Sequence, residues 1–123
     1  MQIKVSGKGM KVTSALRDYV FAKTEKFEEF FKNIQKVEVL LEARDIDDTK
    51  RSQVAEVRIW LGGLKEIQAI EGGSDMYEAI DLVMAEATSQ IKKHKQMHTD
   101  EQRRKGEKLK EIQRQAAFRS DNL

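Results

Sequence analysis

Residues 54–80 read VAEVRIWLGGLKEIQAIEGGSDMYEAI, and this stretch decides the fold. Apolar residues alternate on both sides of Gly62-Gly63, which predicts two strands joined by a tight turn. Gly72-Gly73 ends the second of these strands. Asp75 with Glu78 three residues later then forms a capping box, the signature of a helix N-terminus. The stretch therefore predicts an antiparallel strand pair followed directly by a helix.

Two further strands are predicted towards the N-terminus. Residues 2–6 and 37–41 alternate polar and apolar side chains, and the polar residues 44–53 are typical of a long hairpin connection. In the third strand the alternation slips in phase between Val54 and Val57, which a β-bulge would explain.

Apolar residues at helical spacing predict two long amphipathic helices. The first begins after the N-cap residue Thr13 and ends near Lys32 or Asn33. The second follows Asp75 and continues its apolar stripe to His94. The order β-α-β-β-β-α predicts an α+β fold, a four-stranded sheet with both helices packed on one face and the other face open to water.

The chain beyond His94 has a different pattern. Lys105 falls where the next apolar residue of the stripe should lie, and Gly106 follows it. We therefore expect one domain at residues 1–98 and a basic, partly helical or mobile C-terminal extension at residues 99–123.

Charge is distributed unevenly along the 123 residues, although the net charge is only +2. Residues 1–91 contain 13 Lys and Arg against 16 Asp and Glu, whereas residues 92–123 contain 10 against 5. A basic end on a mildly acidic body is typical of an arm that binds polyanions, and a solvated, charge-rich helix explains the composition equally well.

Neither cysteine nor a long apolar run occurs in the sequence. The absence of cysteine excludes disulfides and thiolate metal sites. No stretch approaches the roughly 18 apolar residues that a membrane-spanning helix needs, and the N-terminus lacks the layout of a signal peptide. We therefore expect a cytoplasmic protein without a membrane partner.

The sequence offers no catalytic or metal-binding constellation. His94 and His98 are spaced to bind a metal from one helix face, but no carboxylate lies between them and a lysine is adjacent. Asp45, Asp47 and Asp48 lack the glycine and the distal glutamate of a calcium loop. We expect no enzyme activity, no metal, no cofactor and no small-molecule substrate.

Basic side chains that suit an RNA backbone fall on the two predicted helices: Arg17, Lys23 and Lys26 on the first, and Lys92, Lys93 and Lys95 on the second. Cations at the end of a helix also stabilise its dipole, but the run from Lys92 to Lys95 is longer than this effect needs, and successive phosphates would use several of its charges. Lys23 occupies the apolar face of its helix. Either its stem lies along apolar surface, or its ammonium emerges between the helices towards a ligand.

Trp60 is a further candidate on the open sheet face, where it could stack on a nucleobase. A single aromatic residue between two aliphatic ones more often covers sheet surface.

Several segments resemble the ribosome hibernation factors of bacteria and plastids, formerly called sigma-factor modulation proteins, which include hibernation promoting factor and ribosome-associated inhibitor A. The segments are Gly7-Lys8, Val12-Thr13, ALRDYV at residues 15–20 with Lys23, DMYEAID at residues 75–81 and QIKKHK at residues 90–95. The resemblance covers about residues 1–95. Because a second dimerisation domain would not fit in the remaining residues, the chain is expected to be a short type with a tail.

The resemblance implies a fold similar to a double-stranded-RNA-binding domain and a role without chemistry. Such a protein, itself expected to be monomeric, would bind the small ribosomal subunit between head and body, in the channel of messenger and transfer RNAs. It would thereby silence translation under stress or in stationary phase. The resemblance implies contacts to ribosomal RNA phosphates from a set of basic residues: Arg17, Lys23, Lys26, Lys92, Lys93 and Lys95, with Lys8 a weaker candidate.

Two of the departures from the family pattern concern charge. Glu86 and Ser89 stand where a basic residue is usual, which shifts the expected RNA footprint towards the C-terminal end. Whether the protein promotes or prevents ribosome dimers is left open. Two alternative functions also remain, a general double-stranded-RNA-binding module and a protein-interaction adaptor whose tail docks through Leu109 and Ile112.

Overall fold

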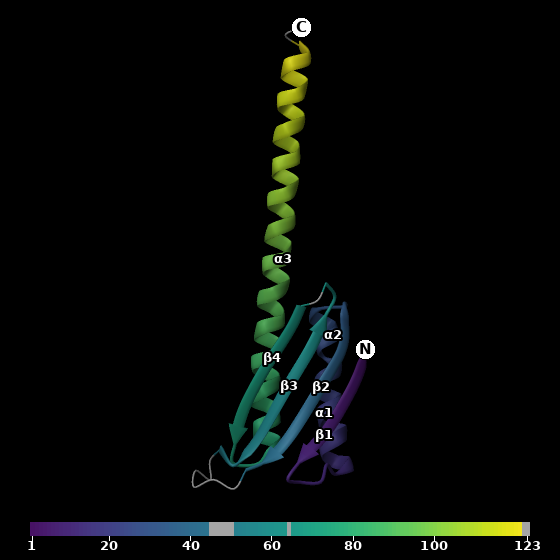
Figure 1. Cartoon of the computed structure of the whole chain (residues 1–123), viewed down its shortest axis with the longest axis vertical. Helices are drawn as coiled ribbons and strands as arrows, with labels where there is room; N and C mark the ends of the chain where they lie inside the picture. The colour runs from purple at the N-terminus through teal and green to yellow at the C-terminus, as the bar shows by residue number, and fades with distance from the viewer. Residues whose placement is uncertain (45–50, 64, 122–123) are drawn as a thin grey trace. The chain divides into compact units, whose positions relative to one another are not determined.

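The computed structural model describes residues 1–44, 51–63 and 65–121, and side chains at 98–102, 111 and 113–121 lie outside the description (Figure 1). The chain forms two compact units, Met1–Lys92 and Lys93–Leu123, and the sheet belongs to the first. The expected division into a domain at 1–98 and an extension at 99–123 stays a prediction.

Four strands form one mixed sheet in the order β1-β2-β3-β4, as Figure 1 shows. Their bounds are Gln2–Lys8 for β1, Ile34–Ala43 for β2, Gln53–Leu61 for β3 and Lys65–Gly73 for β4. The first two strands pair in parallel and the other neighbours pair antiparallel. A parallel pair needs a crossover connection, and here the helical segment between β1 and β2 supplies it. The predicted α+β fold is confirmed.

The inner face of the sheet carries the core. Along β2 and β3 every second side chain is almost fully buried: Val37, Val39 and Leu41 on β2, and Ala55, Val57, Ile59 and Leu61 on β3. This alternation follows from the two-residue period of a strand, which turns successive side chains to opposite faces.

The β-bulge expected between Val54 and Val57 is wrong. The two strands β2 and β3 pair in unbroken register along this stretch, and the irregularity lies between Ile34 and Lys36 instead. The phase slip has another cause: the core face of β3 begins at Ala55, while Val54 is buried on the opposite face of the sheet.

The first predicted helix is two helices. Helix α1 spans Ser14–Glu25, and a short helix α2 spans Phe27–Phe30. Thr13 caps α1 as predicted, since its Oγ1 accepts a hydrogen bond from the N–H of Leu16 at 3.2 Å. The predicted end near Lys32 or Asn33 is wrong. Near the break the buried Thr24 turns its hydroxyl to the carbonyl of Phe21, at 3.0 Å, a side-chain bond of the kind that weakens a helical ladder.

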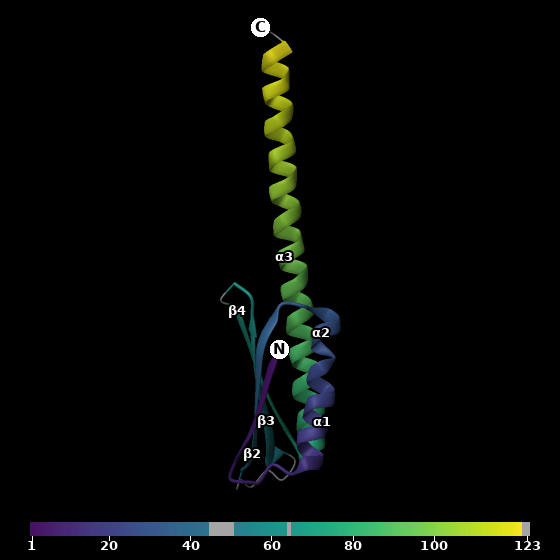
Figure 2. The ribbon, with the colours of Figure 1, turned by 90° about the vertical axis from the view of Figure 1, so that its right-hand side faces the viewer.

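The last helix, α3, spans Met76–Asp121. Asp75 caps it, because Oδ1 accepts a hydrogen bond from the N–H of Glu78 at 2.9 Å. The Glu78 carboxylate in turn accepts from the hydroxyl of Ser74 at 2.8 Å, which completes a variant of the predicted capping box. Up to Lys92, α3 lies with α1 and α2 on the inner face of the sheet (Figure 2). No helix of the described part is long and apolar enough to span a membrane.

Candidate nucleic-acid interface

Helices α1 and α3 lie side by side and run in the same direction. The side chain of Tyr19 contacts Asp81, and eleven residues further along each chain segment the ring of Phe30 contacts Lys92. We call the surface along this junction the helix seam and define it by six residues: Tyr19, Lys23, Phe30, Tyr77, Asp81 and Lys92. All six lie in segments that the sequence marks as helical, but their proximity requires the tertiary structure.

One carboxylate oxygen ties the two helices together at the seam. The Tyr19 hydroxyl donates a hydrogen bond to Asp81 Oδ1 at 2.5 Å, and Lys23 Nζ lies 3.4 Å from the same oxygen. The hydrogen bond to the carboxylate raises the pKa of Tyr19 above its ordinary value, because it stabilises the protonated phenol. Tyr77 packs edge-on against the Tyr19 ring, with centroids 4.9 Å apart.

Lys23 has its ammonium between the helices, as one of the two sequence-based explanations predicts. Nζ lies 5.3 Å from the centroid of the Tyr19 ring, and the side chain is 33% exposed. The charge reaches the seam, and the half-buried side chain is typical of a lysine whose stem lies along apolar surface.

Lys92 and Lys26 add two more cations on this side of the molecule. Lys92 Nζ lies 4.6 Å from the centroid of the Phe30 ring, a cation–π distance, and Lys92 is exposed. Lys26 is exposed at the C-terminus of α1. It follows Lys23 by three residues, a spacing that places both side chains on one flank of the helical segment. Three of the predicted phosphate contacts therefore lie along one surface of the first compact unit.

Arg17 and Lys8 are not brought to this surface. Arg17 precedes Tyr19 by two residues, and such residues point to nearly opposite sides of an α-helix. Lys8 lies on the open face of the sheet, where its Nζ is 3.9 Å from a carboxylate oxygen of Glu42. An RNA bound at the seam would need a second contact region to reach either residue.

Lys93 and Lys95 belong to the second compact unit, and both are exposed. They follow Lys92 closely in α3. Their assignment as phosphate contacts rests on the sequence and stays a prediction.

Glu86, the acidic departure from the family pattern, lies on a different flank of α3 from Asp81 and Lys92. Gln90 donates a hydrogen bond to Glu86 Oε1 at 3.2 Å and another to the backbone oxygen of Gln68, on β4, at 3.3 Å. These contacts place Glu86 towards the β4 side of the helix. Its negative charge therefore does not interrupt the cations of the seam.

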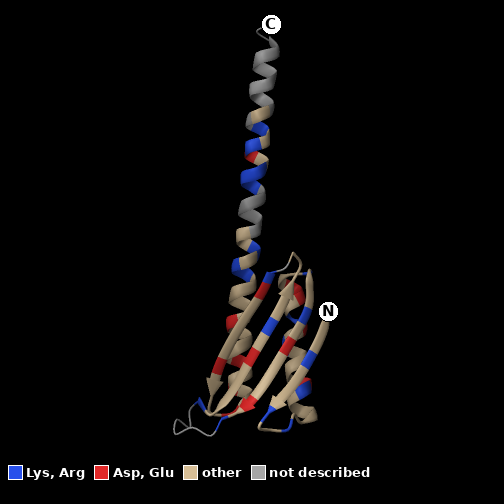
Figure 3. Ribbon diagram, in the orientation of Figure 1, with Lys and Arg blue, Asp and Glu red and all other residues tan. Residues whose placement is uncertain are grey.

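Within the strands, the open face of the sheet has no excess of positive charge. Its charged strand residues are four cations, Lys4, Lys8, Lys36 and Arg58, and four anions, Glu38, Glu42, Glu56 and Glu66. Arg44, which follows β2, pairs with Glu42 at 3.3 Å. Figure 3 shows the two signs interspersed along the strands. Because opposite charges at this spacing neutralise each other, the open face is a poor surface for a polyanion.

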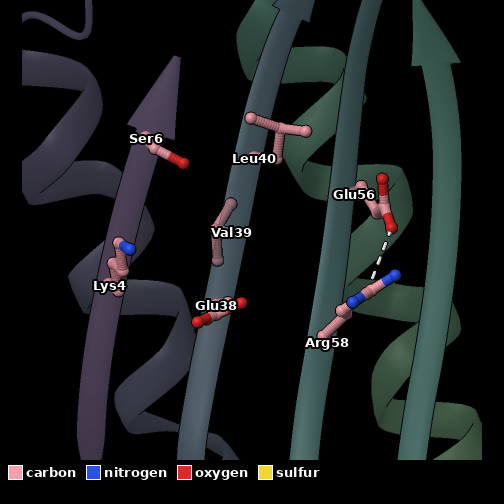
Figure 4. A pocket seen from close by; sticks show the side chains of 7 residues that line it. All are labelled: Lys4, Ser6, Glu38, Val39, Leu40, Glu56 and Arg58. Carbon is pink, nitrogen blue, oxygen red and sulfur yellow. Dashed lines mark ion pairs between the residues drawn. The ribbon is translucent and has the colours of Figure 1, made fainter. Parts of the chain in front are cut away.

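Ion pairs hold these side chains in place. Lys36 Nζ lies 2.8 Å from Glu38, and this contact lowers the pKa of the Glu38 carboxyl. A shallow depression of about 220 Å³ is lined by Lys4, Ser6, Glu38, Val39, Leu40, Glu56 and Arg58, and Figure 4 shows the pair of Glu56 and Arg58, 3.5 Å apart, beside it.

Trp60 does not lie free on this face, because Lys36 Nζ sits 5.2 Å from the centroid of its ring. The structure therefore gives no support to base stacking at Trp60.

Metal binding finds no support among the described residues, which include no group of three His, Asp or Glu side chains arranged to hold an ion. His94 is half-buried, and the side chain of His98 lies outside the described part. Asp45, Asp47 and Asp48, considered as a calcium loop, also lie outside it.

Comparison with known proteins decides the family. The model of the family described as "Sigma 54 modulation protein / S30EA ribosomal protein" matches residues 3–99. The chain belongs to this family. The match includes the whole helix seam and the basic run that begins at Lys92, whereas residues 100–123 lie outside it.

Three curated relatives share one name. The chain is 36% identical over 95 residues to the ribosome hibernation promoting factor of Klebsiella oxytoca, and 35% identical over 95 residues to that of Escherichia coli K12. Each match covers 77% of this chain and 94% of the relative. The protein of the same name from Pseudomonas putida is 35% identical over 96 residues, covering 78% of this chain and 88% of that protein.

Two solved structures agree with the fold. A ribosomal subunit interface protein from Coxiella burnetii superimposes with a TM-score of 0.67 at 25% identity, covering 77% of this chain and 98% of that one. The N-terminal domain of Protein Y from Thermus thermophilus gives a TM-score of 0.66 at 27% identity, covering 76% of this chain and 99% of that one.

Sequence reasoning missed the part of the seam that is not basic. The sequence marks Tyr77 and Asp81 only as parts of the DMYEAID motif, and Phe30 only as a helix residue. The signal that could have found Asp81 is its spacing of four residues from Tyr77, which puts both side chains on one flank of α3.

Proposed function

We propose that this protein is a ribosome hibernation factor, which binds the small ribosomal subunit and silences translation by occupying it. Two observations support the proposal: the chain belongs to the family, and the curated relatives named above are ribosome hibernation promoting factors. Protein Y and the subunit interface protein, whose folds match, point to the same setting. A protein that acts by occupancy needs no nucleophile, metal or cofactor, and its place of action is the cytoplasm.

Ribosomal RNA in the channel of messenger and transfer RNAs is the proposed contact. The seam supports this assignment because Lys23, Lys26 and Lys92 present ammonium groups along one surface, while the open face of the sheet is charge-balanced. Phosphates bound at the seam would release counterions, so the binding should weaken steeply with salt. Lys93 and Lys95 would extend the basic run, and Arg17 and Lys8 would serve only a larger RNA footprint.

Two other functions would use the same molecule differently. A general double-stranded-RNA-binding module would read only duplex shape. A protein-interaction adaptor would dock through the tail, and the described part of α3 does leave Leu109 and Ile112 each 60% exposed. Apolar side chains in such positions suit a partner surface, but isolated exposed apolar residues are also common on soluble helices.

Equilibrium binding of the labelled protein to small ribosomal subunits and to a plain RNA duplex, in the same buffer, tests the proposal. We expect the subunit to bind at least about a hundredfold more tightly, because a specific site adds shape and contact complementarity to the general attraction of phosphates. Comparable affinity for the two would contradict the proposal and favour the general module. Removal of residues 99–123 should leave most of the subunit affinity in place. If the removal of these residues abolishes translational silencing but leaves RNA binding intact, the protein-interaction adaptor is favoured.

A further inference from the structure

Asp81 is an unexpected residue on a surface that binds phosphates. Its side chain is 50% exposed and lies 3.4 Å from Lys23 Nζ, in the region where a phosphate would have to approach that lysine. A carboxylate there repels phosphate and partly neutralises the lysine. If the surface binds RNA, the carboxylate needs a favourable contact with the ligand to offset this repulsion.

The tie between the helices leaves half of the carboxylate available. Both the Tyr19 hydroxyl and Lys23 Nζ contact Oδ1. Neither of these two contacts is made through the second oxygen, Oδ2. An ionised carboxylate accepts hydrogen bonds on both oxygens and donates none, so a hydrogen-bonding partner of Oδ2 must be a donor.

An RNA backbone supplies such a group next to each phosphate. The ribose 2′-hydroxyl is attached to the carbon beside the one that carries the 3′ phosphate, so donor and anion occur as close neighbours. Lys23 and Asp81 present the complementary pair, because the ammonium lies 3.4 Å from Oδ1 and the acceptor Oδ2 belongs to the same carboxylate. DNA would bring the phosphate without the hydroxyl and would meet only the repulsion.

From this juxtaposition we infer that Asp81 Oδ2 accepts a hydrogen bond from a ribose 2′-hydroxyl while Lys23 contacts the adjoining phosphate. Asp81 is then a specificity residue that makes the seam select RNA. This inference rests on the proposed function, because it specifies how the same surface would read the RNA of the subunit.

Acylation of ribose 2′-hydroxyls in small ribosomal subunits, mapped nucleotide by nucleotide, tests the inference with the full-length protein. The variant Asp81→Asn removes the charge and keeps an oxygen that can accept from Tyr19. The matched control is Glu86→Gln, which removes the same charge from the β4 side of α3. Subunits saturated with wild type, with each variant or with no protein are compared.

We expect wild type to protect a small set of 2′-hydroxyls, Asp81→Asn to restore reactivity at one or two of them, and Glu86→Gln to behave like wild type. Because Lys23, Lys26 and Lys92 remain, Asp81→Asn should bind subunits within about tenfold of the wild-type affinity.

Other outcomes overturn the inference in distinguishable ways. Identical protection by wild type and Asp81→Asn would mean that the carboxylate only ties the helices together. A change that appears only in the dimethyl sulfate reactivity of base edges, mapped on the same complexes, would assign Oδ2 to a nucleobase. If wild type does not bind subunits at all, the proposed function fails and the inference fails with it, whereas normal binding with unchanged protection overturns the inference alone.

Discussion

Replacing Lys92, Lys93 and Lys95 together with glutamate should weaken binding to the small ribosomal subunit by at least about a hundredfold at moderate salt. Each lysine that contacts a phosphate contributes attraction and counterion release, and each glutamate adds repulsion. The slope of log affinity against log salt should also become less steep, by about one for each phosphate that the variant no longer binds. Co-sedimentation with purified subunits at several salt concentrations measures both effects.

A matched variant separates this local effect from a general change of net charge. Lys4, Lys11 and Lys65 are exposed and lie away from the seam, and their replacement with glutamate alters the net charge by the same amount. We expect that variant to bind subunits within about tenfold of the wild-type affinity, since exposed charges far from a binding site act only through screened, long-range attraction. Equal effects of the two triple variants would show that the basic run is not the binding site.

Phe27→Ala should lower the stability of the protein severely. Phe27 is 1% exposed and is one of the largest side chains in the core. Truncating such a residue removes its transfer free energy and leaves a cavity, so we expect the free energy of unfolding to fall by about 3–5 kcal/mol. Denaturant unfolding monitored by circular dichroism measures the change.

Phe30→Ala serves as the comparison, because Phe30 is only half-buried against the core and its truncation should cost clearly less. If both variants are destabilised equally, the break between α1 and α2 does not position Phe27 as the structure shows. This pair of variants also tests the break between α1 and α2, where the sequence predicted one continuous helix.

Some features of the fold follow from local sequence, and the break between α1 and α2 does not. The strands were predictable because one apolar face per strand gives strict alternation, and the start of α3 because Asp75 and Glu78 supply a cap within four residues. The break at Lys26 was not predictable, because Phe27 continues the apolar spacing across it. The periodicity of a stripe does not reveal where the helical backbone is interrupted.

The candidate site likewise has features that the sequence predicts and features that it does not predict. Its cations are visible in the sequence as charges on helices, but their grouping is not. Arg17 and Lys23 share a helix and lie on different flanks, and Lys8 lies on the opposite face of the sheet. The tie between Tyr19 and Asp81 joins residues 62 positions apart, so only tertiary packing brings it about.

Titration of a reconstituted translation reaction with the purified protein tests whether occupancy of the small subunit silences translation, with ribosome-bound protein measured on sucrose gradients of the same samples. We expect protein synthesis to fall in proportion to the fraction of small subunits that carry the protein, and to stop when every subunit is occupied. Full translation by ribosomes saturated with the protein, or absence of the protein from the small-subunit fractions, would show that it does not act in this way.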